Sequence, residues 1–265
     1  MTESIQVSFI GTLLAALTFF TRLPRIPYPS YSANDDKYAA AFAPWVGWLV
    51  AVVAIGVLKF GYGWLPVPVI VTLMMIATVW FTGALHEDGF ADYCDAFGTQ
   101  RSREQTLEIM RDPRVGVFGV VGLVLALLLK FSLLSALVNG LPLAATIVVI
   151  VVAHTVSRFV AVSFMSTHGY ARRDDETAKA GKLSTGLPLP WLLWAMLGAT
   201  IPLLAAAWWV AWSLLWIVPA LIGVRIWFAL SFQRRLGGYT GDCLGAAQQA
   251  SELVILLVVA AAWLI

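Results

Sequence analysis

The sequence predicts an all-α, polytopic helical membrane protein with about seven transmembrane helices and a short N-terminal interfacial or re-entrant helix. Three observations support this fold class. The chain has 265 residues, of which 60% are hydrophobic and only 12% are charged. Its mean hydropathy is +0.83, and a soluble domain of this length needs far more polar surface. Several apolar stretches of roughly 20 residues are each long enough to cross a hydrocarbon core about 30 Å thick.

Seven segments are expected to span the membrane, and they follow one another along the chain: 40–58, 68–83, 117–138, 142–164, 188–209, 213–231 and 245–265. Pro66, Pro142 and Pro188 are typical of helix starts. The apolar stretch Val7–Phe20 is short for a span, so the sequence leaves open whether it crosses the membrane. Because there is no internal repeat or separable soluble segment, residues 1–265 are predicted to form a single integral-membrane catalytic domain.

The basic residues predict the orientation of the chain. All but four of the 17 Lys and Arg lie in segments that fall on one face when the seven spans alternate: 21–38, 84–116, 165–187 and 232–244. The positive-inside rule makes that face cytoplasmic and puts the C-terminus outside. The net charge of +2 indicates no nucleic-acid partner, and membrane lipids are the expected surroundings. Cys94 and Cys243 lie beside cytoplasmic motifs, which argues against a disulfide.

The most unusual feature is an acidic string at residues 86–95, directly after a long apolar run. Asp88, Asp92 and Asp95 are spaced i, i+4, i+7, which stacks them on one face of a helix. Three carboxylates in such a stripe are hard oxygen ligands that suit Mg²⁺ or Mn²⁺ better than zinc. His86 could orient a ligand or take a proton near neutral pH. The alternative is a solvated helix end whose acids complement the helix dipole.

A second polar stretch lies at residues 110–119. Asp112 could complete a metal shell or orient a substrate group, and Arg111 and Arg114 carry forked donors that match phosphate oxygens. Gly116, at the start of the next span, would let a phosphate or a helix approach its backbone closely. The alternative is that the arginines only anchor this loop at anionic lipid headgroups.

A third cluster, residues 237–245, runs into the last span. Asp242 and Glu252 lie on roughly one helical face. Glu252 is two to three turns into the span, where an unpaired carboxylate is costly, so it should meet a cation or a hydrogen-bond donor. The structural alternative is a pairing with Arg158 or Arg225.

Together these clusters suit metal-assisted transfer at a phosphate or pyrophosphate. The sequence has no P-loop, HExxH or Gly-x-Ser-x-Gly motif, which argues against the corresponding classes of ATPase, zinc protease and serine hydrolase. One alternative is a CDP-alcohol-phosphotransferase-like enzyme acting on a nucleotide-activated lipid, although the Ala-Arg pair and longer spacer of that motif are absent. Another is a cation- or proton-coupled transporter. The acids lie at one face, however, whereas a transport path needs groups near the midplane.

Four motifs, in order, resemble the cobalamin synthase family, the adenosylcobinamide-GDP ribazoletransferases: Phe20–Pro24, Gly83–Gly98, Ile109–Gly116 and Gly237–Ala246. The resemblance implies a transferase in a late step of cobalamin biosynthesis. The phosphocobinamide group of adenosylcobinamide-GDP would pass to α-ribazole or its 5′-phosphate, with loss of GMP. It also implies Mg²⁺ and a bacterial inner-membrane location.

The chain departs from the family pattern at four positions. Ala84 stands where a second glycine is common, Glu87 where an apolar residue is common, and Pro113 where serine is frequent. Gln249 replaces a frequent glutamate, which could remove one candidate ligand.

On this basis we assign expected roles. Metal ligation is expected from Asp88, Asp92, Asp95, Asp112 and Glu252, with Asp242 as an alternative ligand. Catalytic roles are expected for His86, Asp88, Asp92, Arg114 and Asp242. Substrate binding is expected from Arg22, Arg111, Arg172, Gly116 and Gly241. The proton acceptor is left as His86 or one carboxylate. Tryptophans at 191, 194, 208, 209, 212 and 216 could form interfacial belts or a surface for a second copy of the chain.

Overall fold

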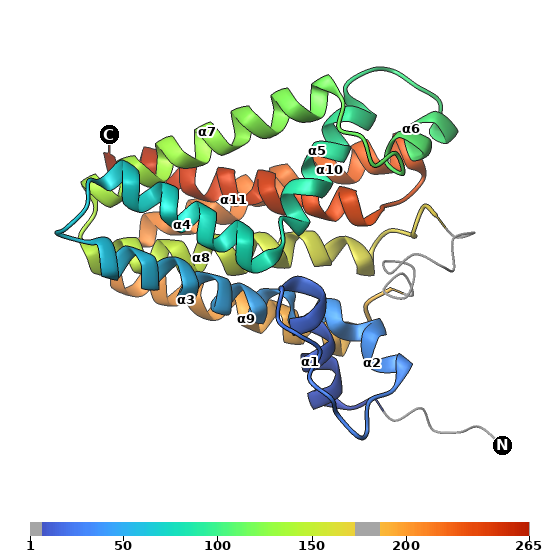
Figure 1. The fold of residues 1–265 in the computed structure, drawn as a ribbon, viewed down its shortest axis with the longest axis horizontal. Coiled ribbons are helices and arrows are strands. Elements are labelled where there is room, and N and C mark those ends of the chain that lie inside the picture. The colour runs from blue at the N-terminus through green and yellow to red at the C-terminus, as the bar shows by residue number, and fades with distance from the viewer. Residues whose placement is uncertain (1–6, 173–185, 265) are drawn as a thin grey trace.

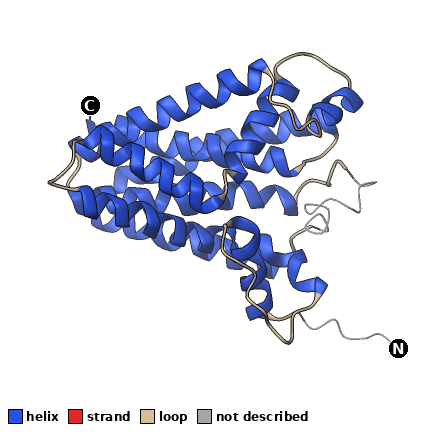
Figure 2. Ribbon diagram, viewed as in Figure 1, coloured by secondary structure: helices blue, strands red, loops and turns tan. Residues whose placement is uncertain are grey.

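The fold is built from helices and loops, as the computed structural model shows for residues 7–172 and 186–264 (Figure 2). The longer helices are α1 (Phe9–Phe20), α3 (Ala43–Gly61), α4 (Val67–Thr82), α5 (Leu85–Phe97), α7 (Val117–Gly140), α8 (Leu143–Ser163), α9 (Leu189–Trp209), α10 (Ile217–Leu236) and α11 (Gly241–Leu264). Short helical pieces are α2 (Ala33–Tyr38), η1 (Ala39–Phe42), α6 (Arg103–Ile109), η2 (Phe164–Ser166) and η4 (Trp212–Trp216). Residues 173–185 of the basic segment 165–187 lie outside the described part of the chain.

The described residues contain six to seven candidate spans, in line with the predicted number of about seven. Six helical segments are long and apolar enough to cross a membrane, and the bent pair α4–α5 brings the number to seven. The bounds differ most in the last two spans. Helix α10 runs from Ile217 to Leu236 rather than over 213–231, and the last helix begins at Gly241 rather than at residue 245. Asp242 therefore lies in the first turn of α11 and not in a loop before it.

The spans run along one another, so their links collect at two ends (Figure 1). The links at 62–66 and 141–142 lie at the same end as the C-terminus, whereas α1, α2 and α6 lie at the opposite end. Because the spans alternate in direction, the described parts of the predicted basic segments also lie at this opposite end. We call it the basic end of the bundle.

Helix α1 stays at the basic end. Its 12 residues make a helix only about 18 Å long, which is too short to span a bilayer. The carboxylate of Asp35 ties it to α2, because its two oxygens accept hydrogen bonds from the backbone N–H groups of Ser8 (2.8 Å) and Ser32 (2.9 Å). This arrangement favours the interfacial interpretation of the N-terminal helix over a transmembrane one.

A sharp turn separates α4 from α5. Gly83 and Ala84 both have left-handed backbone angles, with φ of 69° and 59°, and the two helices are bent by 89°. Two successive left-handed residues end a helix and redirect the chain. Helix α5 therefore turns aside at the basic end, and it carries the acidic string of residues 86–95 with it.

The tryptophans fall into two groups. Trp208, Trp209, Trp212 and Trp216 are exposed around the link between α9 and α10, as expected of an interfacial belt. Trp194, in contrast, stacks on Trp45 with ring centroids 4.6 Å apart.

Candidate active site at the basic end

A cavity of about 660 Å³ lies at the basic end, between α1 and η1 on one side and α5, α8 and α11 on the other. Much of its wall is apolar and includes Phe19 and Phe20 of α1. Four of the predicted site residues line it: His86, Asp88, Gly241 and Asp242. These four come from two segments far apart in sequence, so the fold brings two of the predicted motifs to one cavity.

Close packing of α5 on α11 creates this arrangement. A Cβ added at Gly89 would stand 2.9 Å from the Cα of Asp242, so only glycine lets the two backbones approach this closely. The carboxylates of Asp88, Asp95 and Asp242 all act electrostatically on Asp92, and Asp88 also acts on Asp242. Four acidic side chains therefore lie close enough across the α5–α11 contact to repel one another when they are ionised.

Arg172 is a cation in direct contact with this acidic group. Its Nη2 lies 3.0 Å from Oδ2 of Asp242 and also donates to the Met110 carbonyl oxygen at 3.2 Å. The backbone before Arg172 is held by a bridge, because the Ala171 N–H donates to the Tyr239 carbonyl oxygen at 2.8 Å. The structure thus joins Arg172, predicted to bind substrate, to Asp242, predicted to be catalytic.

Asp95 has a different partner. Its two carboxylate oxygens accept hydrogen bonds from the backbone N–H groups of Gly116 (2.7 Å) and Gly119 (2.8 Å). Those groups belong to the N-terminus of α7, where a negative charge is stabilised by the helix dipole. The sequence predicted that a substrate phosphate or a helix would approach Gly116. In the structure, a carboxylate from α5 occupies this place.

Asp112 and Arg114 pair with each other away from the cavity. The Nη2 of Arg114 lies 2.6 Å from Oδ2 of Asp112, and the Arg114 side chain is 87% exposed. Hydrogen bonds from Arg114 lower the pKa of Asp112 to about 2, so this carboxylate is ionised at neutral pH. Arg111 is exposed on the same loop. None of the three lines the cavity.

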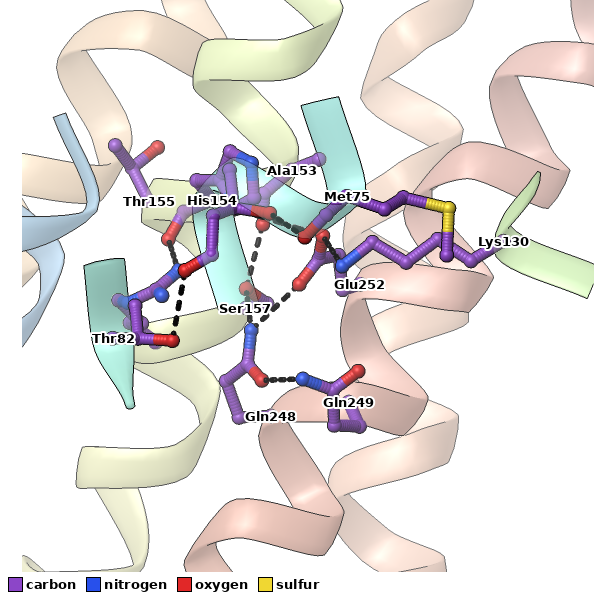
Figure 3. A network of polar contacts seen from close by, with 12 residues as sticks. Met75, Thr82, Lys130, Ala153, His154, Thr155, Ser157, Gln248, Gln249 and Glu252 are labelled. Carbon is purple, nitrogen blue, oxygen red and sulfur yellow. Dashed lines mark hydrogen bonds and ion pairs between the residues drawn. The ribbon is translucent and has the colours of Figure 1, made fainter. Parts of the chain in front are cut away.

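Glu252 is buried within the bundle and bound to a lysine. Its Oε1 lies 2.7 Å from Nζ of Lys130, and its Oε2 accepts a hydrogen bond from Gln248 at 2.9 Å (Figure 3). The expected cation is thus present, but it is Lys130 rather than Arg158 or Arg225. Gln248 and Gln249 extend the network to α5, where Gln249 donates to Oε1 of Glu87 at 3.0 Å.

Two cavity-lining arginines were not predicted as site residues. Arg22, which was predicted, lies with its guanidinium 5.9 Å from the ring centroid of Trp80 and does not line the cavity. Arg25, three residues later, does line it. So does Arg158, for which the sequence left open a place in the cavity wall or a pairing with an acid such as Glu252. Its spacing of four residues from His154, on one face of α8, was the available signal.

The carboxylates at this site are chemically suitable ligands for Mg²⁺, but only a few of them are available to bind it. Within the described ranges, no three His, Cys, Asp or Glu side chains are placed to hold a metal ion. Of the five predicted ligands, Asp95, Asp112 and Glu252 have the partners given above, which leaves Asp88 and Asp92 beside Asp242. Mg²⁺ commonly binds through one or two carboxylates, several waters and substrate phosphates. The mutual repulsion of the carboxylates also favours a cation between them.

Comparison with known proteins identifies the family of the chain. The family model described as cobalamin-5-phosphate synthase matches residues 12–260. Among curated relatives named adenosylcobinamide-GDP ribazoletransferase, the protein of Shewanella sp. (strain W3-18-1) is 40% identical, over 94% of this chain and 93% of its own. Those of Ralstonia nicotianae and Shewanella amazonensis are 41% and 42% identical, each over 94% of this chain and 95% of its own. No solved structure matches the chain.

The family match includes every motif described above, from the end of α1 to the first turns of α11. The chain therefore belongs to the cobalamin-5-phosphate synthase family.

Proposed function

We propose that this protein transfers the phosphocobinamide group of adenosylcobinamide-GDP to α-ribazole or α-ribazole 5′-phosphate and releases GMP. A ribazole hydroxyl oxygen forms the new bond to phosphorus as the bond to the GMP oxygen breaks. The observation that carries the proposal is the meeting of Asp88 and Asp242 on one wall of the 660 Å³ cavity. The relatives that are named for this reaction match almost the whole chain.

Asp88 and Asp92 are the residues that would hold Mg²⁺. Asp242, the alternative ligand, lies beside them but is bound to Arg172. When bound, the ion would polarise the pyrophosphate and stabilise charge on the departing GMP. Asp95, Asp112 and Glu252 are not among the proposed ligands, because each has another partner. Asp95 is bound by the N-terminus of α7, Asp112 by Arg114 and Glu252 by Lys130.

The remaining roles follow from position. Arg172, bound to Asp242, lies where it can balance charge on the transferred phosphoryl group. His86 lines the cavity next to Asp88, which supports its proposed role in taking the proton of the attacking hydroxyl. The alternative acceptor is one of the carboxylates. The His86 ring stacks on Phe20, with ring centroids 6.3 Å apart, which orients the imidazole.

The proposed location is the bacterial inner membrane, with the cavity on the cytoplasmic side. The cytoplasmic side is supported by the gathering of the described basic residues at the cavity end and by the positive-inside rule. It can be tested with single cysteines in a Cys94→Ala, Cys243→Ala background. A membrane-impermeant maleimide should label Trp64→Cys in intact cells and Gln100→Cys only after lysis. The reverse pattern would contradict the orientation.

Product analysis tests the reaction. The purified protein should release GMP from adenosylcobinamide-GDP when α-ribazole or its 5′-phosphate is added with Mg²⁺, and a chelator should stop the release. CDP-diacylglycerol with the same acceptors should yield no product. Failure to release GMP with either acceptor would contradict the proposal, and comparison of the two acceptors identifies the natural one.

A further inference from the structure

Within the described part of the chain, Arg158 is a buried arginine without a carboxylate partner. It lies on α8 and is only 3% exposed. A guanidinium keeps its charge in proteins, and burying it within a membrane span is costly unless it is paired. Lys130, which is also buried in a span, is paired at 2.7 Å with Glu252. For Arg158, the described residues provide no carboxylate within ion-pairing distance.

The hydrogen bonds of Arg158 are also incomplete. Its Nη1 donates to the backbone carbonyl oxygen of His154, one turn earlier on the same helix, at 2.7 Å. Its Nε is buried and has no hydrogen-bond partner. A buried donor left without a partner costs free energy. At least one N–H donor of the Arg158 guanidinium is therefore available to a further hydrogen-bond acceptor.

A purely structural role as a counter-charge does not account for this geometry. Glu252 and Glu87 both act on Arg158 electrostatically, but Glu252 is already bound by Lys130 and Gln248. The second carboxylate oxygen of Glu87, Oε2, is likewise buried and without a hydrogen-bond partner. If Arg158 served to neutralise Glu87, these two unpaired groups would bond to each other.

The position of Arg158 explains what it could bind. It lines the same cavity as His86, Asp88 and Asp242. Helix α8 runs toward the basic end, and Ala161, Val162 and Met165 line the cavity nearer to that end. Arg158 is therefore at the inner end of the α8 wall. The cavity thus has carboxylates on the α5–α11 side and a buried, unpaired arginine on the α8 side.

We propose that Arg158 is a substrate-binding residue that donates hydrogen bonds to a phosphate oxygen of the nucleotide-activated substrate. This inference rests on the proposed function. The anion completes the hydrogen bonding of the guanidinium and neutralises its charge within the span. Its other oxygens remain available to the carboxylate side of the cavity, where a bound Mg²⁺ would meet them. An anion held from both sides is fixed in position before the acceptor arrives.

The test measures binding of adenosylcobinamide-GDP, without acceptor, to the full-length protein in lipid nanodiscs. Arg158→Gln should raise the Kd at least about tenfold, which is the effect of losing a charge-assisted hydrogen bond. Arg158→Lys, which keeps the charge but loses the fork, should be intermediate. Thermal unfolding of each variant is measured in parallel, and its midpoint should stay near that of the unsubstituted protein.

Arg225→Gln is the matched control. Arg225 also lies in a span, but it bonds to the Ser163 hydroxyl at 2.9 Å, packs on Phe164 and does not line the cavity. Its substitution should leave the Kd within about twofold, since it removes the same charge from the bundle without touching the proposed contact.

An Arg158→Gln protein that binds the substrate as tightly as the unsubstituted one would overturn the inference. So would equal weakening in the Gln and Lys variants together with a lowered unfolding midpoint, because that pattern is structural. If the Gln variant does not fold, the Lys variant decides: a Kd raised threefold or more at an unchanged midpoint supports the inference, and an unchanged Kd contradicts it. GMP release by the unsubstituted protein is measured separately, so failure of the proposed function can be distinguished from failure of this inference.

Discussion

Gly89 of α5 and Gly245 of α11 face each other where the two acidic motifs meet. A Cβ added at Gly245 would stand 3.3 Å from the Cα of Gly89 and 3.1 Å from the His86 carbonyl oxygen. A Cβ added at Gly89 would stand 2.9 Å from the Cα of Asp242. This contact between helices sets the distance between the acids of α5 and Asp242.

Gly89→Ala should therefore separate α5 from α11. The clash is with backbone, which cannot rotate away, and a displacement of about 1 Å at a catalytic group can cost about 100-fold in rate. GMP release should fall by about that factor. Gly245→Ala should be milder, because its contacts are longer. Gly56→Ala on α3, where nothing lies within 4 Å, is the control and should keep full activity.

The turn between α4 and α5 makes a second prediction. Ala84 adopts a left-handed conformation that costs an L-residue about 1–2 kcal/mol, whereas glycine adopts it freely. Glycine also gives the unfolded chain more freedom, which offsets about 0.4–1 kcal/mol. Ala84→Gly should thus leave the unfolding midpoint unchanged or slightly higher, and Ala84→Val should lower it. A stabilising effect of valine would contradict the backbone assignment.

Asp95 should behave as a structural residue. Asp95→Ala removes the acceptor for two N–H groups of α7 and should cost about 1 kcal/mol of stability. The Mg²⁺ concentration that gives half-maximal activity should stay the same, because the proposed metal site excludes this carboxylate. Asp112→Asn, which loses only an exposed pair with Arg114, should change neither quantity measurably. A raised Mg²⁺ requirement in Asp95→Ala would restore it as a ligand.

The buried pair of Lys130 and Glu252 gives a fourth prediction. Lys130→Met leaves a buried carboxylate without its cation and should cost about 3 kcal/mol or more. Adding Glu252→Met should recover most of this loss, since the double variant buries no unpaired charge. Thermal unfolding in detergent measures both. If the double variant were as unstable as the single one, the pair would not be the main partner of Glu252.

Much of the fold was predictable from the sequence, because span length and hydrophobicity are local properties. The spacing of Asp88, Asp92 and Asp95 likewise predicted the helix that the structure shows at α5. The 89° turn before it was not predicted. One of its two left-handed residues is Ala84, and alanine does not indicate such a conformation.

The partners of the acids were harder to predict, because they depend on how distant helices meet. The α7 N-terminus becomes the partner of Asp95 only once α5 has turned aside and packed beside it. The cation that Glu252 meets depends on the depth and rotation of three spans, and it proved to be Lys130. The sequence did indicate that such a partner must exist, since an unpaired carboxylate there is costly.

The central claim is that Asp88 and Asp92 carry the metal-dependent step, and paired variants test it most directly. GMP release from adenosylcobinamide-GDP is measured against Mg²⁺ concentration for Asp88→Asn, Asp92→Asn and the control Asp112→Asn. The first two should lose nearly all release while keeping the unfolding midpoint, and the control should match the unsubstituted protein. Near-normal, Mg²⁺-dependent release by both Asp88→Asn and Asp92→Asn would contradict the account.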